Sequence, residues 1–318
     1  MVDRKKKAVG YIVSFGAGIL ILIWLLSRVG ITELANACKG LDAFFVFVAI
    51  SMVVANVFYK SKRWQILVNL ASTDKISMKL AMLSTLSGIF GGNTTPIRGG
   101  VFLKSVILKR YGIPYTRSIA LIMVEYGLDF MILMMCAALG LALIRFRTYT
   151  PFVALFCLLC FSLLFLFFPL NPLKRVVQRF HKVKKIHDVV MESIRGMEIV
   201  RESRRYSVYV LTLSFLTFFF EFLILCLVLR SFGLPIPILM LAAVYFISVS
   251  AGVLSMIPAG MGVTELSMVM LLTTIIGIPS NIGYAVTLIY RLISSYLIIL
   301  IGGMISTFWI TTTPIKKD

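Results

Sequence analysis

The chain has 318 residues, of which 59% are hydrophobic and only 14% are charged, and these proportions exclude an ordinary soluble domain. Soluble domains carry about 25% charged residues and about 45–50% apolar residues. The formal net charge of +19 would suggest a nucleic-acid partner in a soluble protein. Here most Lys and Arg residues lie in short segments between long apolar blocks, a distribution typical of membrane proteins, so nucleic acid is not expected.

The first apolar block, residues 8–26, follows four consecutive basic residues and is expected to be a retained first span. A cleaved signal peptide is the alternative, since residues 35–38 resemble a cleavage or lipoprotein site. However, the segment between the block and that site contains Arg28 and Glu33 and is too long and too charged for a signal peptide.

Further apolar blocks divide into complete and interrupted ones. Five are long enough to be full spans across a hydrocarbon core about 30 Å thick: residues 44–59, 118–144, 152–168, 206–229 and 282–310. Two others, 76–110 and 239–277, are interrupted by Gly- and Pro-rich segments that a continuous helix cannot contain. The sequence therefore predicts an all-α polytopic integral membrane protein with about six full spans and two re-entrant or broken-helix hairpins. A looser count gives about eight membrane segments, in a single transmembrane domain over residues 1–318.

One long polar segment, residues 171–205, holds ten Lys and Arg residues against four Asp and Glu residues. Its apolar residues recur at helical spacing, which indicates a basic amphipathic helix on the membrane surface. A solvated cytoplasmic loop is the alternative. On either interpretation the segment is expected at the cytoplasmic face, where it would attract anionic lipid headgroups.

The distribution of basic residues predicts one orientation. Twenty-five Lys and Arg residues are assigned to the cytoplasmic side and five to the outside, with Arg98 and Arg291 inside the membrane. We therefore expect a multi-pass protein of the cell membrane with both termini in the cytoplasm.

The two interrupted blocks share a pattern. Residues 96–100 and 258–262 both read P-x-x-x-G, and the offset of 162 residues also relates Asp129 to Arg291. Since the first unit starts from the cytoplasmic side and the second from the outside, the pattern predicts an inverted-topology repeat of about 44–144 and 206–310. Chance is the alternative, because Gly and Pro are common in transmembrane helices.

Several ionisable residues are expected at membrane depth, where each costs roughly 2.5–3.5 kcal/mol unless it is paired or wet. These residues are Arg98, Glu125, Asp129, Glu221, Glu265 and Arg291. Glu125 and Asp129 are four residues apart on one helical face, so they would repel each other unless a cation lies between them or one is protonated. Arg98 and Arg291 are the expected cations. Glu221 is expected to be structural or protonated.

No catalytic, metal or cofactor motif is recognisable. Cys157 and Cys160 lie inside an apolar run, where small hydrophobic residues are ordinary. Lys104-Ser105 lacks the preceding Gly of a P-loop. We therefore expect no enzyme, no bound metal and no cofactor.

Four motifs together resemble the flippase-like family that includes the transmembrane region of lysylphosphatidylglycerol synthase, the multiple peptide resistance factor. They are Asn93-x-x-Pro96-x-Arg98-x-Gly100, Glu125-x-x-x-Asp129, Ser255-x-x-Pro258-x-Gly260-x-Gly262-x-x-Glu265, and Arg291. Arg63-Trp64 also fits, and the resemblance covers nearly the whole chain. Val101 and Tyr126 depart from it, since the family often has Glu and Arg there. No polar block of the size of the synthase's aminoacyl-transferring domain is recognisable, so lipid aminoacylation is not expected.

The resemblance implies movement of a lipid with a polar or phosphate headgroup between leaflets, either an aminoacylated phospholipid or a polyprenyl-phosphate-linked sugar. The candidate substrate-binding residues are Asn93, Arg98, Glu125, Asp129, Ser255, Pro258, Gly262, Glu265 and Arg291. A secondary transporter of a soluble anion and a non-transporting membrane scaffold are the alternatives. Besides the lipid substrate and anionic headgroups, a second copy of the chain in a homodimer is an optional partner.

Overall fold

The computed structural model describes residues 40–72, 75–145 and 204–312, together with residues 191, 194 and 198. The expected spans at 8–26 and 152–168 lie outside the described residues, as does nearly all of the polar segment 171–205. The regular elements in the described ranges are all helical, and five helical stretches are long and apolar enough to cross a membrane. The chain is thus an all-helical, polytopic membrane protein.

Four of these stretches coincide with expected full spans. They are α3 (Ala43–Ala71), α6 (Tyr115–Arg145), α10 (Arg204–Ser231), and the path of α13 (Ser280–Arg291), the π-helical turn η4 (Leu292–Tyr296) and α14 (Leu297–Thr312). The fifth, Pro258–Ile276, was assigned to a hairpin by sequence. It reaches the length of a span because a short 3-10 turn precedes α12 and a π-helical turn follows it.

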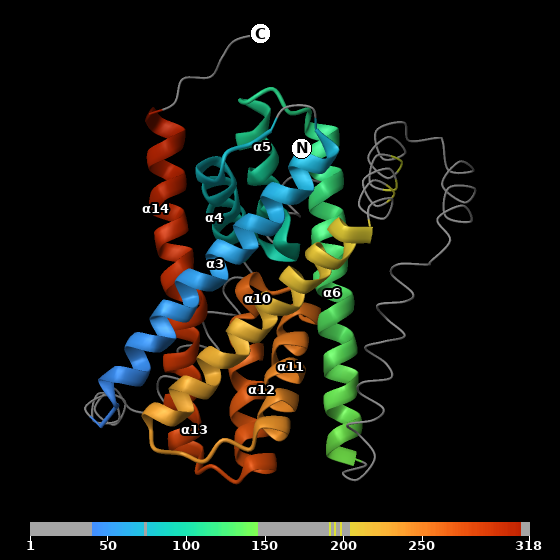
Figure 1. The fold of residues 1–318 in the computed structure, drawn as a ribbon. Coiled ribbons are helices and arrows are strands. Elements are labelled where there is room, and N and C mark those ends of the chain that lie inside the picture. The colour runs from blue at the N-terminus through green and yellow to red at the C-terminus, as the bar shows by residue number, and fades with distance from the viewer. Residues whose placement is uncertain are drawn as a thin grey trace, which may run out of the picture.

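Helices α3 and α10 lie side by side in opposite directions. The amide of Asp42, at the start of α3, donates to the carbonyl oxygen of Ser231, at the end of α10, at 3.1 Å. Further along, the Asn56 amide donates to the carbonyl oxygen of Thr217 at 3.0 Å. In Figure 1 both helices run obliquely across the molecule, between α14 on one side and α6 on the other.

Hairpin 1 (residues 78–109) consists of α4 (Met78–Thr94), the 3-10 helix η1 (Pro96–Phe102) and α5 (Leu103–Lys109). The Ser77 hydroxyl caps the start of α4 by accepting from the amide of Leu80 at 3.3 Å. Helix α4 meets η1 where the backbones of Gly91 and Gly100 touch, because a Cβ on either glycine would overlap backbone atoms of the other. Only glycine permits so close an approach.

Hairpin 2 (residues 238–276) repeats this arrangement with α11 (Ile238–Leu254), the 3-10 turn η2 (Pro258–Gly260), α12 (Val263–Leu271) and the π-helical turn η3 (Leu272–Ile276). The prediction that no continuous helix passes through Pro96 or Pro258 is confirmed. Figure 1 shows α4 and α5 in one half of the molecule and α11 and α12 in the other, and η1 contacts η2 between them.

Candidate functional site

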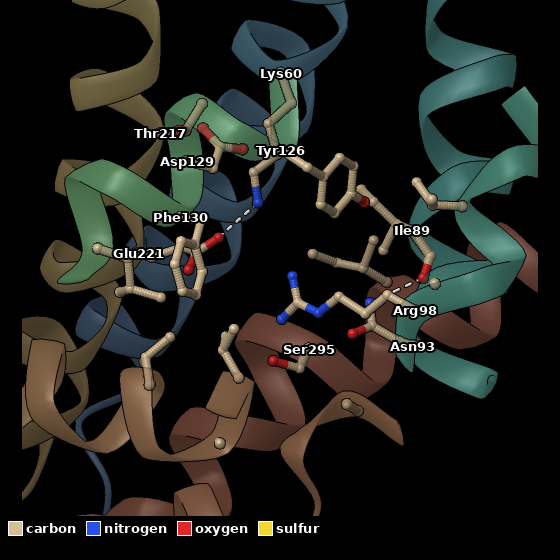
Figure 2. Close-up of a pocket in the computed structure, with 18 of the residues that line it drawn as sticks. Lys60, Ile89, Asn93, Arg98, Tyr126, Asp129, Phe130, Thr217, Glu221 and Ser295 are labelled. Atoms are coloured by element: carbon tan, nitrogen blue, oxygen red, sulfur yellow. Dashed lines mark hydrogen bonds and ion pairs between the residues drawn. The ribbon is translucent and has the colours of Figure 1, made fainter. Parts of the chain in front are cut away.

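A cavity of about 460 Å³ lies among α3, α6, α10, the two hairpins and the segment from α13 to α14. Five basic residues line it, namely Lys60, Arg63, Arg98, Lys104 and Arg291. Three acidic residues do so as well, namely Glu125, Asp129 and Glu221. Such a concentration of charge inside an apolar bundle requires pairing or hydration, and Figure 2 shows the part of the cavity around Arg98.

Arg63 is the centre of the first charged group. Its Nη1 lies 2.6 Å from Asp129 Oδ1, its Nη2 lies 2.8 Å from Asp129 Oδ2 and 3.0 Å from Glu125 Oε1, and Nη1 also donates to Ser214 Oγ at 2.8 Å. Lys104 Nζ lies 2.5 Å from Glu125 Oε2. We call Arg63, Lys104, Glu125 and Asp129 the tetrad. It contains two cations and two carboxylates, and it joins α3, α5 and α6.

The tetrad corrects the expected pairing of Glu125 and Asp129. Their cations are Arg63 and Lys104, whereas Arg98 and Arg291 were expected. The distribution of basic residues predicts the cytoplasmic side for the stretches 60–79 and 104–117, which contain Lys60, Arg63 and Lys104, because they adjoin apolar blocks. Instead α3 continues as one helix to Ala71, and α5 folds back into the bundle, which carries these residues inside.

The tetrad is shielded from solvent to different degrees. The side chains of Arg63, Lys104 and Glu125 are 2–3% exposed, whereas that of Asp129 is 26% exposed. The ring of Trp64 lies beneath Lys104, with Nζ 4.4 Å from its centroid. The sequence identified the two carboxylates of the tetrad through the Glu125-x-x-x-Asp129 motif, and the Arg63-Trp64 pair was its signal for Arg63.

Arg291 forms a second charged group with hairpin 2. Its Nε lies 2.6 Å from Glu265 Oε1, and its Nη2 donates to the carbonyl oxygen of Ala259 at 2.7 Å. Its Nη1 donates to Ser295 Oγ at 3.0 Å, and the Tyr296 hydroxyl donates to Glu265 Oε1 at 2.6 Å. We call this set the Arg291 tie, because it fastens α13 and η4 to the break in hairpin 2. Every nitrogen of the guanidinium is therefore already engaged.

Glu221 belongs to a third group, which is the most exposed of the three. Its Oε1 lies 2.6 Å from Lys60 Nζ, and its Oε2 accepts from the Tyr245 hydroxyl at 2.9 Å. The side chains of Lys60 and Glu221 are 26% and 23% exposed. This contact links α3, α10 and α11, which agrees with the structural role expected for Glu221.

Arg98 differs from the other basic residues of the cavity. It lies in η1 with a φ of +54°, a left-handed conformation that is costly for a residue with a Cβ. Among the residues that the structure describes, no ion pair or side-chain hydrogen bond includes its guanidinium. Figure 2 shows that the guanidinium extends into the cavity, from the side of Asn93 toward Ser295.

The remaining predicted site residues divide between lining and framework. Asn93 lines the cavity, and its amide donates to the carbonyl oxygen of Ile89 at 2.8 Å. Ser255 donates to the carbonyl oxygen of Gly252 at 2.7 Å and so ends α11. Pro258 begins η2, and Gly262, with a φ of +81°, precedes α12.

Glu265 is fully buried, and the lining of the cavity does not include it, Ser255, Pro258 or Gly262.

Large apolar residues on the outer surface also belong to the cavity. Met123 and Phe130 of α6 are 48% and 45% exposed, and Met256, at the break in hairpin 2, is 60% exposed. We call these three residues the rim. The cavity is therefore charged inside and apolar where it reaches the surface of the helical bundle.

Comparison with known proteins gives matches over most of the chain. The family described as "Lysylphosphatidylglycerol synthase TM region" matches residues 8–302. A UPF0104 membrane protein of Methanocaldococcus jannaschii is 24% identical over 93% of each chain. A UPF0104 membrane protein of Methanothermobacter thermautotrophicus is 24% identical over 92% of each chain, and one of Pyrococcus horikoshii is 24% identical over 90% of this chain and 92% of its own.

Proposed function

Because the chain belongs to the family of the lysylphosphatidylglycerol synthase transmembrane region, we propose that it moves a phosphate-bearing lipid between the two leaflets of a cell membrane. The observation that carries the proposal is the cavity with a charged interior and an apolar rim. A phosphate that crosses a hydrocarbon core alone pays a large desolvation cost. A charged cavity lowers that barrier, while an apolar rim lets the lipid chains stay among other lipids.

Arg98 is the residue we assign to the phosphate. Its guanidinium lacks a carboxylate partner among the described residues and extends into the cavity. A guanidinium can hold two phosphate oxygens at once through its planar fork of donors. Arg291 was an equal candidate by sequence, but its contacts with Glu265, Ala259 and Ser295 favour a structural role.

The order of the helices supports an inverted-topology repeat. Residues 43–71 of α3, advanced by 162, become 205–233, and α10 spans Arg204–Ser231. Residues 78–94 of α4 become 240–256, and α11 spans Ile238–Leu254. The antiparallel packing of α3 against α10 is what two units of opposite orientation require. In transporters with such repeats the substrate binds where broken helices of the two units meet.

The same features bear on the alternatives. A cavity of about 460 Å³ with unshared charge argues against a scaffold that only packs helices. A transporter of a soluble anion would use Arg98 equally well, so the rim is what favours a lipid. We infer no enzymatic activity. We further infer cytoplasmic termini from the distribution of basic residues outside the cavity.

Translocation can be measured with the purified full chain in vesicles that contain a trace of fluorescent phosphatidylglycerol. A membrane-impermeant reductant destroys the label in the outer leaflet only, so that loss of the protected fraction reports movement between leaflets. We expect the wild type to lose the protected fraction of the label, with or without an imposed proton gradient. Arg98→Lys should lose part of it, and Arg98→Gln should lose none. A wild type that behaves like protein-free vesicles with every phosphate-bearing lipid supplied would refute the proposal.

Arg230→Gln is the matched control for these variants. Arg230 is an exposed arginine in the last turn of α10 and does not line the cavity. The Arg230→Gln variant therefore removes one positive charge from the protein, as Arg98→Gln does, without changing the cavity. If Arg230→Gln reduced lipid translocation as much as Arg98→Gln, the effect of Arg98→Gln would not be specific to the cavity.

A further inference from the structure

The balance of charge in the cavity restricts the headgroup that can enter it. Four carboxylates belong to the three charged groups, and each is already held by protein donors. Glu125 is held by Arg63 and Lys104, and Asp129 by Arg63. Glu221 is held by Lys60 and the Tyr245 hydroxyl, and Glu265 by Arg291 and the Tyr296 hydroxyl.

Five basic residues line the cavity, and four of them are paired with these four carboxylates. One positive charge is therefore unmatched, and it belongs to Arg98. A ligand with one negative charge restores neutrality. A ligand that also brings an ammonium group would place it near Arg98 without a free carboxylate to receive it. Like charges repel strongly where water is scarce.

The uncharged part of the lining points to hydroxyl groups. Thr85 lines the cavity, is only 2% exposed, and has a hydroxyl without a hydrogen-bond partner in the described structure. A buried unpaired hydroxyl costs free energy unless something bonds to it. The side chains of Tyr126, Thr217 and Ser294 also line the cavity and add polar groups without net charge.

We propose that the cavity selects a lipid whose headgroup is a single phosphodiester bearing an uncharged, hydroxyl-rich group, such as a sugar or glycerol, and no amino group. The inference rests on the proposed function for the lipid nature of the ligand. It separates the two substrate classes that the sequence left open. An aminoacylated phospholipid carries at least one ammonium and does not fit this charge balance, whereas a polyprenyl-phosphate-linked neutral sugar does.

Binding to the detergent-purified full chain tests the selection directly, by native mass spectrometry with three probes. The probes are dioctanoyl phosphatidylglycerol, its lysyl ester and a short polyprenyl-phosphate hexose. We expect the lysyl ester to bind about tenfold or more weakly than at least one of the other two probes. The comparison between those two tells whether the chain prefers a diacylglycerol or a polyprenyl lipid. A lysyl ester that binds as tightly as both would overturn the inference.

Variants then test the cause of the selection. Arg98→Gln should weaken binding of the preferred phosphodiester about tenfold and leave the lysyl ester unchanged or tighter, and Arg230→Gln should change neither. The double variant Arg98→Gln/Lys60→Gln removes two cations and releases Glu221, so it should reverse the preference toward the lysyl ester. If the preference persists in the double variant, unmatched charge is not its cause and the inference is wrong.

The binding and translocation experiments can refute the two proposals separately. Selective binding of the phosphodiester without movement between leaflets would refute the proposed function and leave the charge selection intact. Movement of all three lipids at equal rates, with equal binding, would preserve the proposed function and refute the selection.

Discussion

The guanidinium of Arg63 holds both carboxylate oxygens of Asp129, at 2.6 and 2.8 Å, and thereby joins α3 to α6 inside the helical bundle. This two-point contact fixes the angle as well as the distance between the partners. Through Glu125 the same guanidinium is coupled to Lys104 on the returning arm of hairpin 1. The position of hairpin 1 beside the cavity therefore depends on buried charges as well as on apolar packing.

The tetrad predicts that removal of one charge is more harmful than removal of two opposite charges. Glu125→Gln leaves Arg63 and Lys104 with a single carboxylate, and breaking a buried pair in this way typically costs about 3–5 kcal/mol. The double variant Glu125→Gln/Lys104→Gln restores neutrality and should recover part of that loss. Thermal unfolding in detergent, followed by size-exclusion chromatography, gives the comparison. A single variant as stable as the wild type would show that the tetrad is not coupled in this way.

Within the described ranges, the sequence was sufficient to place the full spans and the breaks but not to pair the charges. Apolar block length and the Gly and Pro clusters are local features, and they placed the four full spans that lie in the described ranges and both interruptions. Charge pairing depends on which helix faces which, and Arg63 and Asp129 are 66 residues apart. Nothing local distinguishes a lysine at a membrane boundary from one that a folded-back helix carries inside, as Lys104 shows.

The sequence identified only part of the cavity lining, because the lining also depends on which helices face one another. Asn93, Arg98, Glu125, Asp129 and Arg291 line the cavity, and their binding of a substrate stays a prediction. Ser255, Pro258 and Gly262 belong to the motif that carries the family resemblance, and the structure places them in the framework of the break in hairpin 2. Lys60 was missed because it follows an apolar block, where a basic residue normally marks the membrane surface.

Hairpin 1 should be sensitive to a methyl group at one glycine and tolerant at another. In Gly91→Ala the new Cβ would overlap the carbonyl oxygen of Gly100, so α4 and η1 must separate. In Gly99→Ala the new Cβ meets nothing within 4 Å. We expect Gly91→Ala to lower the unfolding temperature clearly and Gly99→Ala to leave it nearly unchanged. Equal unfolding temperatures of the two variants would show that α4 and η1 are not in contact at Gly91 and Gly100.

Substitution of Arg291 should lower the stability of the protein, whereas substitution of Arg98 should weaken lipid binding. Arg291→Gln breaks contacts with Glu265, the Ala259 carbonyl and Ser295, so we expect a loss of stability of about 3–5 kcal/mol. Arg98→Gln breaks no ion pair or side-chain hydrogen bond that the structure describes. Its unfolding temperature should therefore stay near that of the wild type, while binding of the preferred phosphodiester weakens about tenfold. The two measurements on each variant are thermal unfolding and native mass spectrometry with the preferred phosphodiester. The roles would have to be exchanged if Arg291→Gln were stable and unable to bind.

The rim should be in contact with lipid chains. Met123, Phe130 and Met256 are 48%, 45% and 60% exposed, and each also lines the cavity. We propose to replace the five native cysteines, place single cysteines at these positions and at Asn93, and attach nitroxide spin labels in reconstituted vesicles. Oxygen concentrates in the hydrocarbon core and a nickel chelate stays in water, so the relaxation each causes reports the surroundings of the label.

The rim labels should respond mainly to oxygen, and the label at Asn93 should respond more to the chelate because the interior of the cavity is polar. If the rim labels respond mainly to the chelate, the cavity opens to water instead of lipid, and a transporter of a soluble anion becomes the better explanation of Arg98.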